Sequence, residues 1–222
     1  MVALDGPAGA GKSTAARLLA ERLGYVLVDT GALYRGVALA AHERGVSWDD
    51  GAALGPLVDG LALTFELGVD GSARLHIDRV DRAGEIRTPA ISDGASRVSR
   101  HVEVRKALLG LQRRLGESGG VVLEGRDIGT VVFPDAEVKI YLTASDEARA
   151  KRRHDELARA GHAIAFDEVL AEIRERDRRD SERDIAPLKP AHDALLVDTS
   201  GSTLDEVVGQ LESIVRDEIR KA

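Results

Sequence analysis

Five short runs of apolar residues, many of them β-branched, recur along the chain. Runs that are apolar on both faces are typical of buried parallel strands, because helices cover such strands on both sides. The segments between the runs carry apolar residues at helical spacing, which predicts amphipathic helices. Strands and helices that alternate in this way predict an α/β doubly wound sheet. The expected strands are residues 2–4, 25–28, 121–123, 138–142 and 195–197, and the expected helices are residues 13–23, 32–44, 102–116, 146–160 and 203–221.

Two segments interrupt this alternation. Residues 61–88 alternate apolar and polar positions between turn signals at Gly68, Asp70-Gly71 and Ala83-Gly84. This pattern predicts a small antiparallel insertion. Residues 152–166 form a charged helix end that continues through Gly161 into another helix, which favours a hinged flap.

Length and composition narrow the class of protein. A chain of 222 residues can bury one continuous core, so we expect a single domain over residues 1–222. The absence of cysteine excludes a disulfide framework and a cysteine nucleophile. A formal net charge of -7 gives no broad attraction to a nucleic acid polymer or an anionic membrane. No apolar run approaches the roughly 18 residues of a membrane span, and the start is unlike a secretory signal, so we expect a cytoplasmic protein.

The most specific motif occupies residues 6–13 and matches the pattern G-x-x-x-x-G-K-[ST]. It lies between the first apolar run and an Ala- and Leu-rich helix, which is the setting of a phosphate-binding P-loop. Glycines let successive backbone N–H groups point at phosphate oxygens, and the helix adds the positive end of its dipole. Lys12 would reach the β- and γ-phosphates, and Ser13 would bind Mg²⁺. The alternative is a glycine-rich turn that merely joins a strand to a helix. The motif consists of Gly6, Pro7, Ala8, Gly9, Ala10, Gly11, Lys12 and Ser13.

A P-loop alone does not separate kinases from GTPases, ATP-driven machines or nucleotide switches. The chain contains no asparagine, so a guanine-recognition motif of the Asn-Lys-x-Asp kind is absent. This absence weakens the hypothesis of a GTPase switch. The third apolar run ends in Glu124, at a place where large ATPases usually carry an Asp that holds Mg²⁺.

Two further segments indicate a small anionic acceptor. Tyr34 and Arg35 follow the second strand, at the carboxyl edge where ligands bind in open α/β sheets. A hydroxyl and a guanidinium suit a phosphate, although an exposed Arg at a helix start is the simpler interpretation. Arg126 and Asp127 follow the third strand at the equivalent edge. A Gly-flanked Arg-Asp pair at this place favours a binding site.

The charged segment 172–184 is a third candidate. On a helix, Arg176, Asp180 and Arg183 would fall within about 60° of one another. The simpler interpretation is a solvated helix with ion pairs, such as Glu172 with Arg176. Beside a P-loop the functional interpretation gains weight, because phosphoryl transfer requires neutralisation of phosphate charge.

These residues together resemble the bacterial cytidylate kinases, a family of P-loop nucleoside monophosphate kinases, over essentially the whole chain. The resemblance implies a core of five parallel strands, a substrate-binding insertion at 61–88 and a short lid at 152–166. The segments GRDIGTVVFPDA and ERDRRD are its most specific landmarks. The landmarks are DGPAGAGKST at 5–14, DTGALYR at 29–35, GEIRT at 84–88, GRDIGTVVFPDA at 125–136 and ERDRRD at 175–180.

The resemblance also implies roles for individual residues. Lys12, Arg126, Asp127 and Arg183 would be catalytic, and Thr14 and Arg152 would join the P-loop in binding ATP. The CMP phosphate would lie among Thr30, Tyr34, Arg35, Arg126 and Arg183. Cytosine would be recognised by Ser96, Arg105 and Asp127, and the ribose and phosphates would lie near Arg176 and Asp180.

Two positions depart from the family pattern. Thr30 stands where the family often has Ser, and the hydroxyl is retained. Glu124 stands where the family often has Asp, so its part in metal binding stays open.

We therefore expect a monomeric kinase of pyrimidine nucleotide metabolism that transfers the γ-phosphoryl group of ATP, with Mg²⁺, to CMP or dCMP. A kinase for UMP or another small phosphorylated acceptor is the first alternative. A P-loop nucleotide switch or ATPase subunit is the second.

Overall fold

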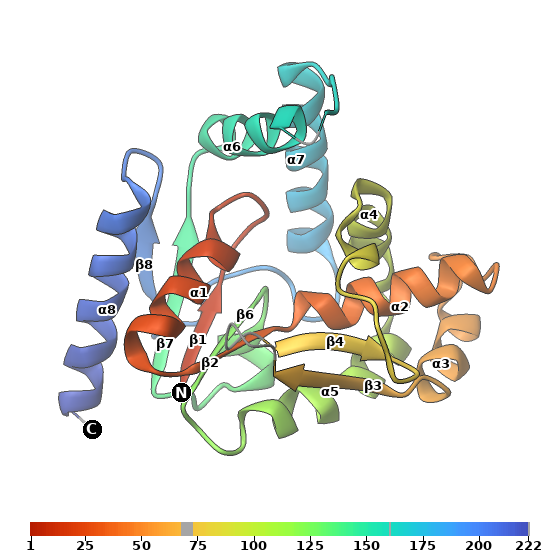
Figure 1. Cartoon of the computed structure of the whole chain (residues 1–222), viewed down its shortest axis with the longest axis horizontal. Coiled ribbons are helices and arrows are strands. Elements are labelled where there is room, and N and C mark those ends of the chain that lie inside the picture. The colour runs from red at the N-terminus through yellow and green to blue at the C-terminus, as the bar shows by residue number, and fades with distance from the viewer. Residues whose placement is uncertain (68–72, 160, 222) are drawn as a thin grey trace.

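The computed structural model describes residues 1–67, 73–159 and 161–221, and at its centre lies a sheet of five parallel strands (Figure 1). The strands are β1 (Val2–Asp5), β2 (Val26–Asp29), β6 (Val121–Gly125), β7 (Val138–Thr143) and β8 (Leu195–Asp198). Their order in the sheet is β2-β6-β1-β7-β8. This confirms the predicted α/β sheet, and each strand runs one or two residues beyond its predicted carboxyl end.

Helices cover both faces of this sheet. The main ones are α1 (Lys12–Leu23) and α8 (Leu204–Lys221) on one face and α5 (Val102–Gly116) on the other, whereas α2 (Gly31–Glu43) lies in a separate apolar cluster. Val2 and Leu4 of β1 belong to the apolar cluster shared with α1 and α8, whereas Ala3 belongs to the cluster on the opposite face, beside α5. The strands read as continuous apolar runs because both of their faces are buried. Within the described ranges, no helix is both long and apolar enough to span a bilayer.

Residues 61–88 contain the predicted antiparallel structure. Strands β3 (Leu63–Leu67), β4 (Ala73–Ile77) and β5 (Val80–Asp81) form a three-stranded antiparallel sheet. The sequence did not indicate the turn between β4 and β5, which places Asp78 and Arg79 at φ values of 51° and 70°.

The turn signals of this insertion have different outcomes. The predicted turn at Ala83-Gly84 is present. The signals at Gly68 and at Asp70-Gly71 lie outside the described residues.

Two helices were missed by the hydrophobic pattern. Helix α3 (Gly51–Asp59) contains Pro56, and its N-terminus is capped by the carboxylate of Asp50. Helix α4 (Pro89–Val98) begins with a proline after the capping residue Thr88. Glycines and prolines made both segments read as loops, but burial against α2 and α5 stabilises them as helices.

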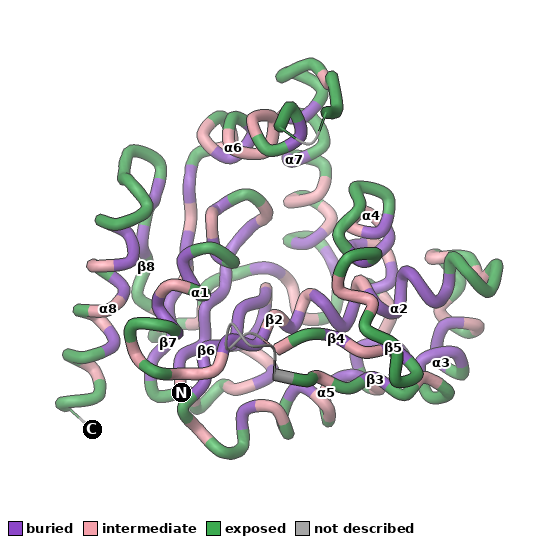
Figure 2. The backbone as a smooth tube through the Cα atoms, in the orientation of Figure 1, coloured by how far each residue is buried: buried purple, intermediate pink, exposed green. Residues whose placement is uncertain are grey.

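Helices α6 (Asp146–Arg159) and α7 (Phe166–Glu182) stand apart from the main core (Figures 1 and 2). They share a separate apolar cluster formed by Ala150, Leu157, Val169 and Ile173. Helix α7 ends at Glu182, so the prediction that Arg183 belongs to the same helix as Arg176 is wrong. The chain turns to an extended conformation at Arg183, with φ -66° and ψ 140°.

Candidate active site

The P-loop connects β1 to α1 and has the backbone that its glycines allow. Gly9 and Gly11 have positive φ values of 75° and 86°, in the left-handed region that favours glycine. A Cβ atom on Gly6 would lie 2.0 Å from the carbonyl oxygen of Leu142, so no larger residue fits there. The loop therefore needs glycine at these positions. Such a backbone can present consecutive N–H groups to an anion.

Lys12 and Ser13 open helix α1. The Nζ atom of Lys12 is buried and donates a hydrogen bond to the carbonyl oxygen of Pro7 at 2.6 Å. Burial and the charge of Arg126 hold the pKa of Lys12 well below its usual range. The hydroxyl of Ser13 donates to Oε2 of Glu124 at 2.9 Å, and burial together with the charge of Asp29 raises the pKa of Glu124 to about 7.

The segment after β2 faces the same edge of the sheet. The hydroxyl of Thr30 donates to the carbonyl oxygen of Glu124 at 2.7 Å, which ties this segment to β6. Arg35 forms an ion pair with Asp29 at 2.5 Å. The hydroxyl of Tyr34 is buried without a hydrogen-bond partner, as is Nε of Arg35. These atoms can still bind a ligand.

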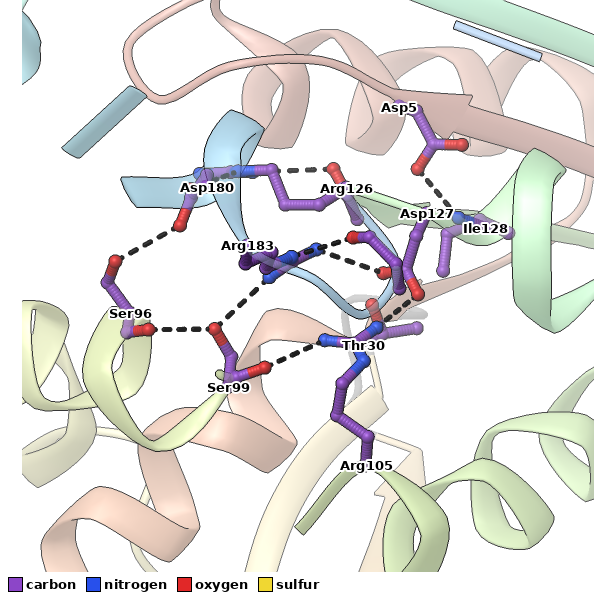
Figure 3. A network of polar contacts seen from close by, with 12 residues as sticks. Asp5, Thr30, Ser96, Ser99, Arg105, Arg126, Asp127, Ile128, Asp180 and Arg183 are labelled. Carbon is purple, nitrogen blue, oxygen red and sulfur yellow. Dashed lines mark hydrogen bonds and ion pairs between the residues drawn. The ribbon is translucent and has the colours of Figure 1, made fainter. Parts of the chain in front are cut away.

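A network of buried polar side chains joins α4, α5, α7 and the loop after β6 (Figure 3). Asp180 accepts a hydrogen bond from Ser96 at 3.0 Å and pairs with Arg126 at 3.2 Å. Asp127 pairs with Arg105, and both side chains are almost fully buried. The sequence-predicted residues of three distant segments thus meet at one place.

Arg183 joins this network from beyond the end of α7. Its guanidinium donates to the hydroxyl of Ser99 at 3.2 Å and lies 3.9 Å from Asp127. Nε of Arg183 donates to the carbonyl oxygen of Ala186 at 2.6 Å, which holds the side chain inward although it lies outside the helix.

Arg176 lies close enough to Arg126 for their positive charges to interact. Burial and the charge of Arg126 lower the pKa of Arg176 to about 10. Burial raises the pKa of Asp180, but the charges of Arg126 and Arg176 hold it below its usual range. Nε of Arg176 and one terminal nitrogen of Arg183 are buried without a hydrogen-bond partner. Unpaired guanidinium donors of this kind are the chemistry of an anion site.

The structure separates the two interpretations of segment 172–184. Among its described residues, no ion pair joins Glu172 to Arg176. Arg174 and Arg178 are more than half exposed and pair with surface carboxylates, whereas Asp180 is buried in the network. The helical phase therefore buries Asp180 in the polar network and leaves Arg174 and Arg178 exposed.

Arg152 and Thr14 lie at the P-loop side. Arg152 reaches from α6 across the loop and donates to the hydroxyl of Thr199 at 2.9 Å and to the carbonyl oxygen of Ala10 at 3.4 Å. Thr14 is exposed in the first turn of α1.

Two buried groups of the site were missed at the sequence level. Asp5 ends β1, and both of its carboxylate oxygens accept backbone hydrogen bonds from the loop after β6. Arg149 donates to the carbonyl oxygen of Ala8 at 3.0 Å and pairs with Asp177 at 2.5 Å. The signal for Asp5 is a charged residue that ends an otherwise apolar buried strand. Arg149 lies among many other charges in its helix, so the sequence offered no signal for it.

A P-loop that faces a cluster of arginines at the carboxyl edge of a parallel sheet defines the class of P-loop phosphotransferases. The model of the cytidylate kinase family matches residues 2–217. Cytidylate kinase from Geobacter sp. (strain M21) is 49% identical over 220 residues, which cover 99% of this chain and 94% of that protein. Cytidylate kinase from Pasteurella multocida (strain Pm70) is 45% identical over 216 residues, which cover 97% of this chain and 95% of that protein. The chain belongs to the cytidylate kinase family.

The fold also occurs at much lower sequence similarity. The crystal structure of an uncharacterized protein from Eubacterium ventriosum superposes with a TM-score of 0.54 at 11% identity, over 97% of both chains. At this identity the likeness concerns the fold alone.

Proposed function

We propose that this chain transfers the γ-phosphoryl group of ATP to CMP or dCMP, giving ADP and CDP or dCDP. The observation that carries the proposal is the set of buried, unpaired guanidinium donors opposite the P-loop in a member of the cytidylate kinase family. A site with a P-loop on one side and guanidinium nitrogens without hydrogen-bond partners on the other suits two phosphorylated substrates at once.

The donor side is the P-loop. We assign Gly6, Pro7, Ala8, Gly9, Ala10, Gly11, Lys12, Ser13, Thr14 and Arg152 to ATP. Lys12 donates to the carbonyl oxygen of Pro7, and its pKa is lowered first by burial and then by the charge of Arg126. An incoming polyphosphate would supply the negative charge that this buried ammonium lacks.

The acceptor side is the buried polar network. We assign the CMP phosphate to Tyr34, Arg35 and Arg183, each of which has a buried polar atom without a hydrogen-bond partner, together with Thr30 and Arg126. Ser96, Arg105 and Asp127 would bind cytosine, because their paired donors and acceptors can exchange partners with a base edge. Arg176 and Asp180 would lie beside the ribose and the phosphates.

We infer that Mg²⁺ binds with ATP and that Ser13 holds it. The hydroxyl of Ser13 lies 2.9 Å from a carboxylate oxygen of Glu124, so the place offers the oxygen ligands that Mg²⁺ prefers. Within the described residues, no group of three or more His, Asp or Glu side chains forms a metal cage. The donor set thus fits a cation that takes most of its ligands from phosphates and water. The bound ion would neutralise charge on the β- and γ-phosphates.

The chemistry asked of the side chains is positioning and charge neutralisation. A phosphate oxygen of CMP is already a nucleophile, so no covalent enzyme intermediate is needed. Lys12, Arg126 and Arg183 would stabilise the charge that develops during in-line transfer. Asp127 would act with them by orienting Arg105 and Arg183, to which it lies close.

Four further assignments follow from the same family. We propose that residues 61–88 contribute to acceptor binding and that residues 152–166 act as a lid. We also propose that the enzyme is a monomer and that it works in the cytoplasm, where its substrates occur.

A coupled assay of ADP release tests the proposed function. Turnover is measured with ATP and Mg²⁺ alone, and then with CMP, dCMP, UMP or AMP added. We expect stimulation by CMP and dCMP. Stimulation by UMP alone would assign the enzyme to a different acceptor, and turnover that does not depend on any acceptor would indicate an ATPase.

A further inference from the structure

Asp5 connects the P-loop to the loop that carries Arg126 and Asp127. It is the last residue of β1 and is 4% exposed. Its Oδ1 atom accepts a hydrogen bond from the backbone N–H of Ile128 at 2.9 Å, as Figure 3 shows. Its Oδ2 atom accepts one from the backbone N–H of Gly129 at 2.8 Å. One carboxylate therefore holds two consecutive backbone groups of a segment more than a hundred residues away in sequence.

These two N–H groups begin the helical turn η2 (Ile128–Val132). The first N–H groups of a helical turn have no acceptor within the turn itself. Asp5 supplies both acceptors from another element. Because Ile128 directly follows Asp127, the carboxylate also fixes where the backbone of Asp127 lies relative to the P-loop.

A carboxylate is unusual at the end of an otherwise apolar buried strand. Val2, Ala3 and Leu4 before it are fully buried. Burial raises the pKa of Asp5 to about 6, although the two backbone N–H groups and the charge of Lys12 favour the ionised form. The native state thus holds this carboxylate ionised at neutral pH at a cost in free energy. Residues retained at such a cost are typical of functional sites.

We propose that Asp5 is a positioning residue for phosphoryl transfer. Through its hydrogen bonds to Ile128 and Gly129, it holds residues 126–127 at a fixed place relative to the P-loop. The inference rests on the proposed kinase function, which assigns Arg126 and Asp127 to the acceptor. In-line transfer needs donor and acceptor at a fixed separation, and a displacement of about 1 Å can cost on the order of 100-fold in rate. Asp5 acts through the loop.

Variants that remove one acceptor oxygen test this role. Asp5→Asn keeps one oxygen and turns an amide group toward an N–H, and Asp5→Ser keeps a single hydroxyl. We expect kcat per folded molecule to fall about 10- to 100-fold in either variant. The KM for CMP should rise, and the preference for CMP over UMP should decrease, because Asp127 is displaced. The KM for ATP should change little, since the P-loop keeps its own backbone.

Lys139→Met is the matched control. Lys139 is buried, and it holds the far end of the same loop by donating to the carbonyl oxygen of Pro134 and to Asp193 at 2.7 Å. Its loss should lower the melting temperature but leave kcat and both KM values unchanged in the folded protein. Asp5 variants that behave like this control would overturn the inference. A wild-type protein that CMP does not stimulate would instead overturn the proposed function.

A measurement on the wild-type protein keeps the inference testable if both Asp5 variants fail to fold. In ¹⁵N-labelled protein, the amide protons of Ile128 and Gly129 report the charge of the carboxylate that they contact. Lys12, Asp127 and Tyr141 are the other titratable groups whose charges bear on Asp5. We expect both amides to shift together with a midpoint near the pKa of about 6, and the amides of Arg126 and Asp127 to follow. Amides of Arg126 and Asp127 that stay constant while Ile128 and Gly129 titrate would show that the carboxylate does not position them.

Discussion

The buried ammonium group of Lys12 lowers the free energy of unfolding. Lys12 is 7% exposed, and its ammonium group donates a hydrogen bond to the carbonyl oxygen of Pro7. Burial and the nearby charge of Arg126 lower its pKa. A lysine whose pKa falls on folding reduces stability at neutral pH, because the unfolded state binds the proton more tightly.

We predict that Lys12→Ala abolishes measurable transfer and leaves the melting temperature equal or slightly higher. The variant removes charge from the transition state and removes no apolar contact from the core. Lys151→Ala is the control, since Lys151 is an exposed lysine of α6 with an ion pair to Asp155. Steady-state kinetics and thermal melting of both variants would check this. Full activity in Lys12→Ala would refute the assignment of the P-loop.

Asp5 gives a prediction for stability against pH. Its pKa is raised from 3.8 to about 6 in the folded state, so the folded state binds this proton more tightly. The resulting contribution is fully present below pH 3.8 and is lost as the pH rises through 6. We expect the unfolding free energy of wild type relative to Asp5→Asn to fall by about 3 kcal/mol between the two limits. Urea unfolding at several pH values measures this, and a difference that does not vary with pH would contradict it.

At the scale of single residues, sequence reasoning located the groups that stand next to a glycine or in a known motif. Arg126 and Asp127 could be found because they follow a buried strand and are flanked by Gly125. Asp5 could have been found as a charge at the end of an apolar strand. Hydrogen-bond partners such as Ser99 could not, because they depend on how helix α4 packs against a residue beyond α7.

At the scale of elements, helix α7 separates site from solvent by its phase. Asp180 lies in the buried network, and Arg174 and Arg178 lie on the outer side with more than half of each side chain exposed. Exposed ion pairs contribute about 0 to 1 kcal/mol to stability. The buried carboxylate of Asp180 balances the charges of Arg126 and Arg176.

We predict that Asp180→Ala raises the KM for CMP more than the KM for ATP. Arg183→Ala should lower kcat as well, because Arg183 would face charge that builds up during transfer. Arg174→Ala and Arg178→Ala are controls that remove exposed arginines of α7, and they should remain close to wild type. Kinetics with each substrate varied in turn would check this. Equal effects in both pairs would show that charge, rather than burial in the polar network, is responsible.

Some ends of helices can be predicted from local sequence signals, and others cannot. The C-terminal helix begins after Thr203, whose hydroxyl and backbone N–H both contact Glu206 in the spacing of a capping box. Helices α3 and α4 escaped prediction because their glycines and prolines are compensated by long-range burial in the cluster around α2. The end of α7 before Arg183 was also missed, since neither a glycine nor a proline marks it in the sequence.

At the scale of the whole molecule, α6 and α7 depend on few apolar contacts. Their shared cluster contains four buried residues, whereas the cluster that the sheet shares with α1 and α8 and the cluster around α2 are both much larger. Polar contacts connect the pair to the rest of the protein. Arg149 reaches the P-loop carbonyl of Ala8, and Asp180 reaches Arg126 and Ser96.

This division predicts a gradient of local stability. Segments with a small apolar cluster open at lower free energy than strands in the core of a sheet. In the ligand-free protein, the amides of α6 and α7 should therefore exchange with deuterium faster than those of β1 and β6. Arg152 donates to the neutral hydroxyl of Thr199, and Nε of Arg176 has no hydrogen-bond partner. Phosphorylated substrates would add charge-assisted hydrogen bonds to both arginines.

We predict that CMP together with a non-hydrolysable ATP analogue slows exchange in α6 and α7 by at least about 10-fold, as expected for a lid that closes on its substrates. Exchange in α8 should not change, because that helix packs on the far side of α1 and belongs to the main core. Hydrogen–deuterium exchange with mass spectrometry resolves these segments. CMP alone and the ATP analogue alone are the controls, and the full effect should need both, since α6 contributes Arg152 and α7 contributes Arg176 and Asp180. If α6 and α7 exchange as slowly as β1 before any ligand is added, they form part of the rigid core and the lid assignment fails.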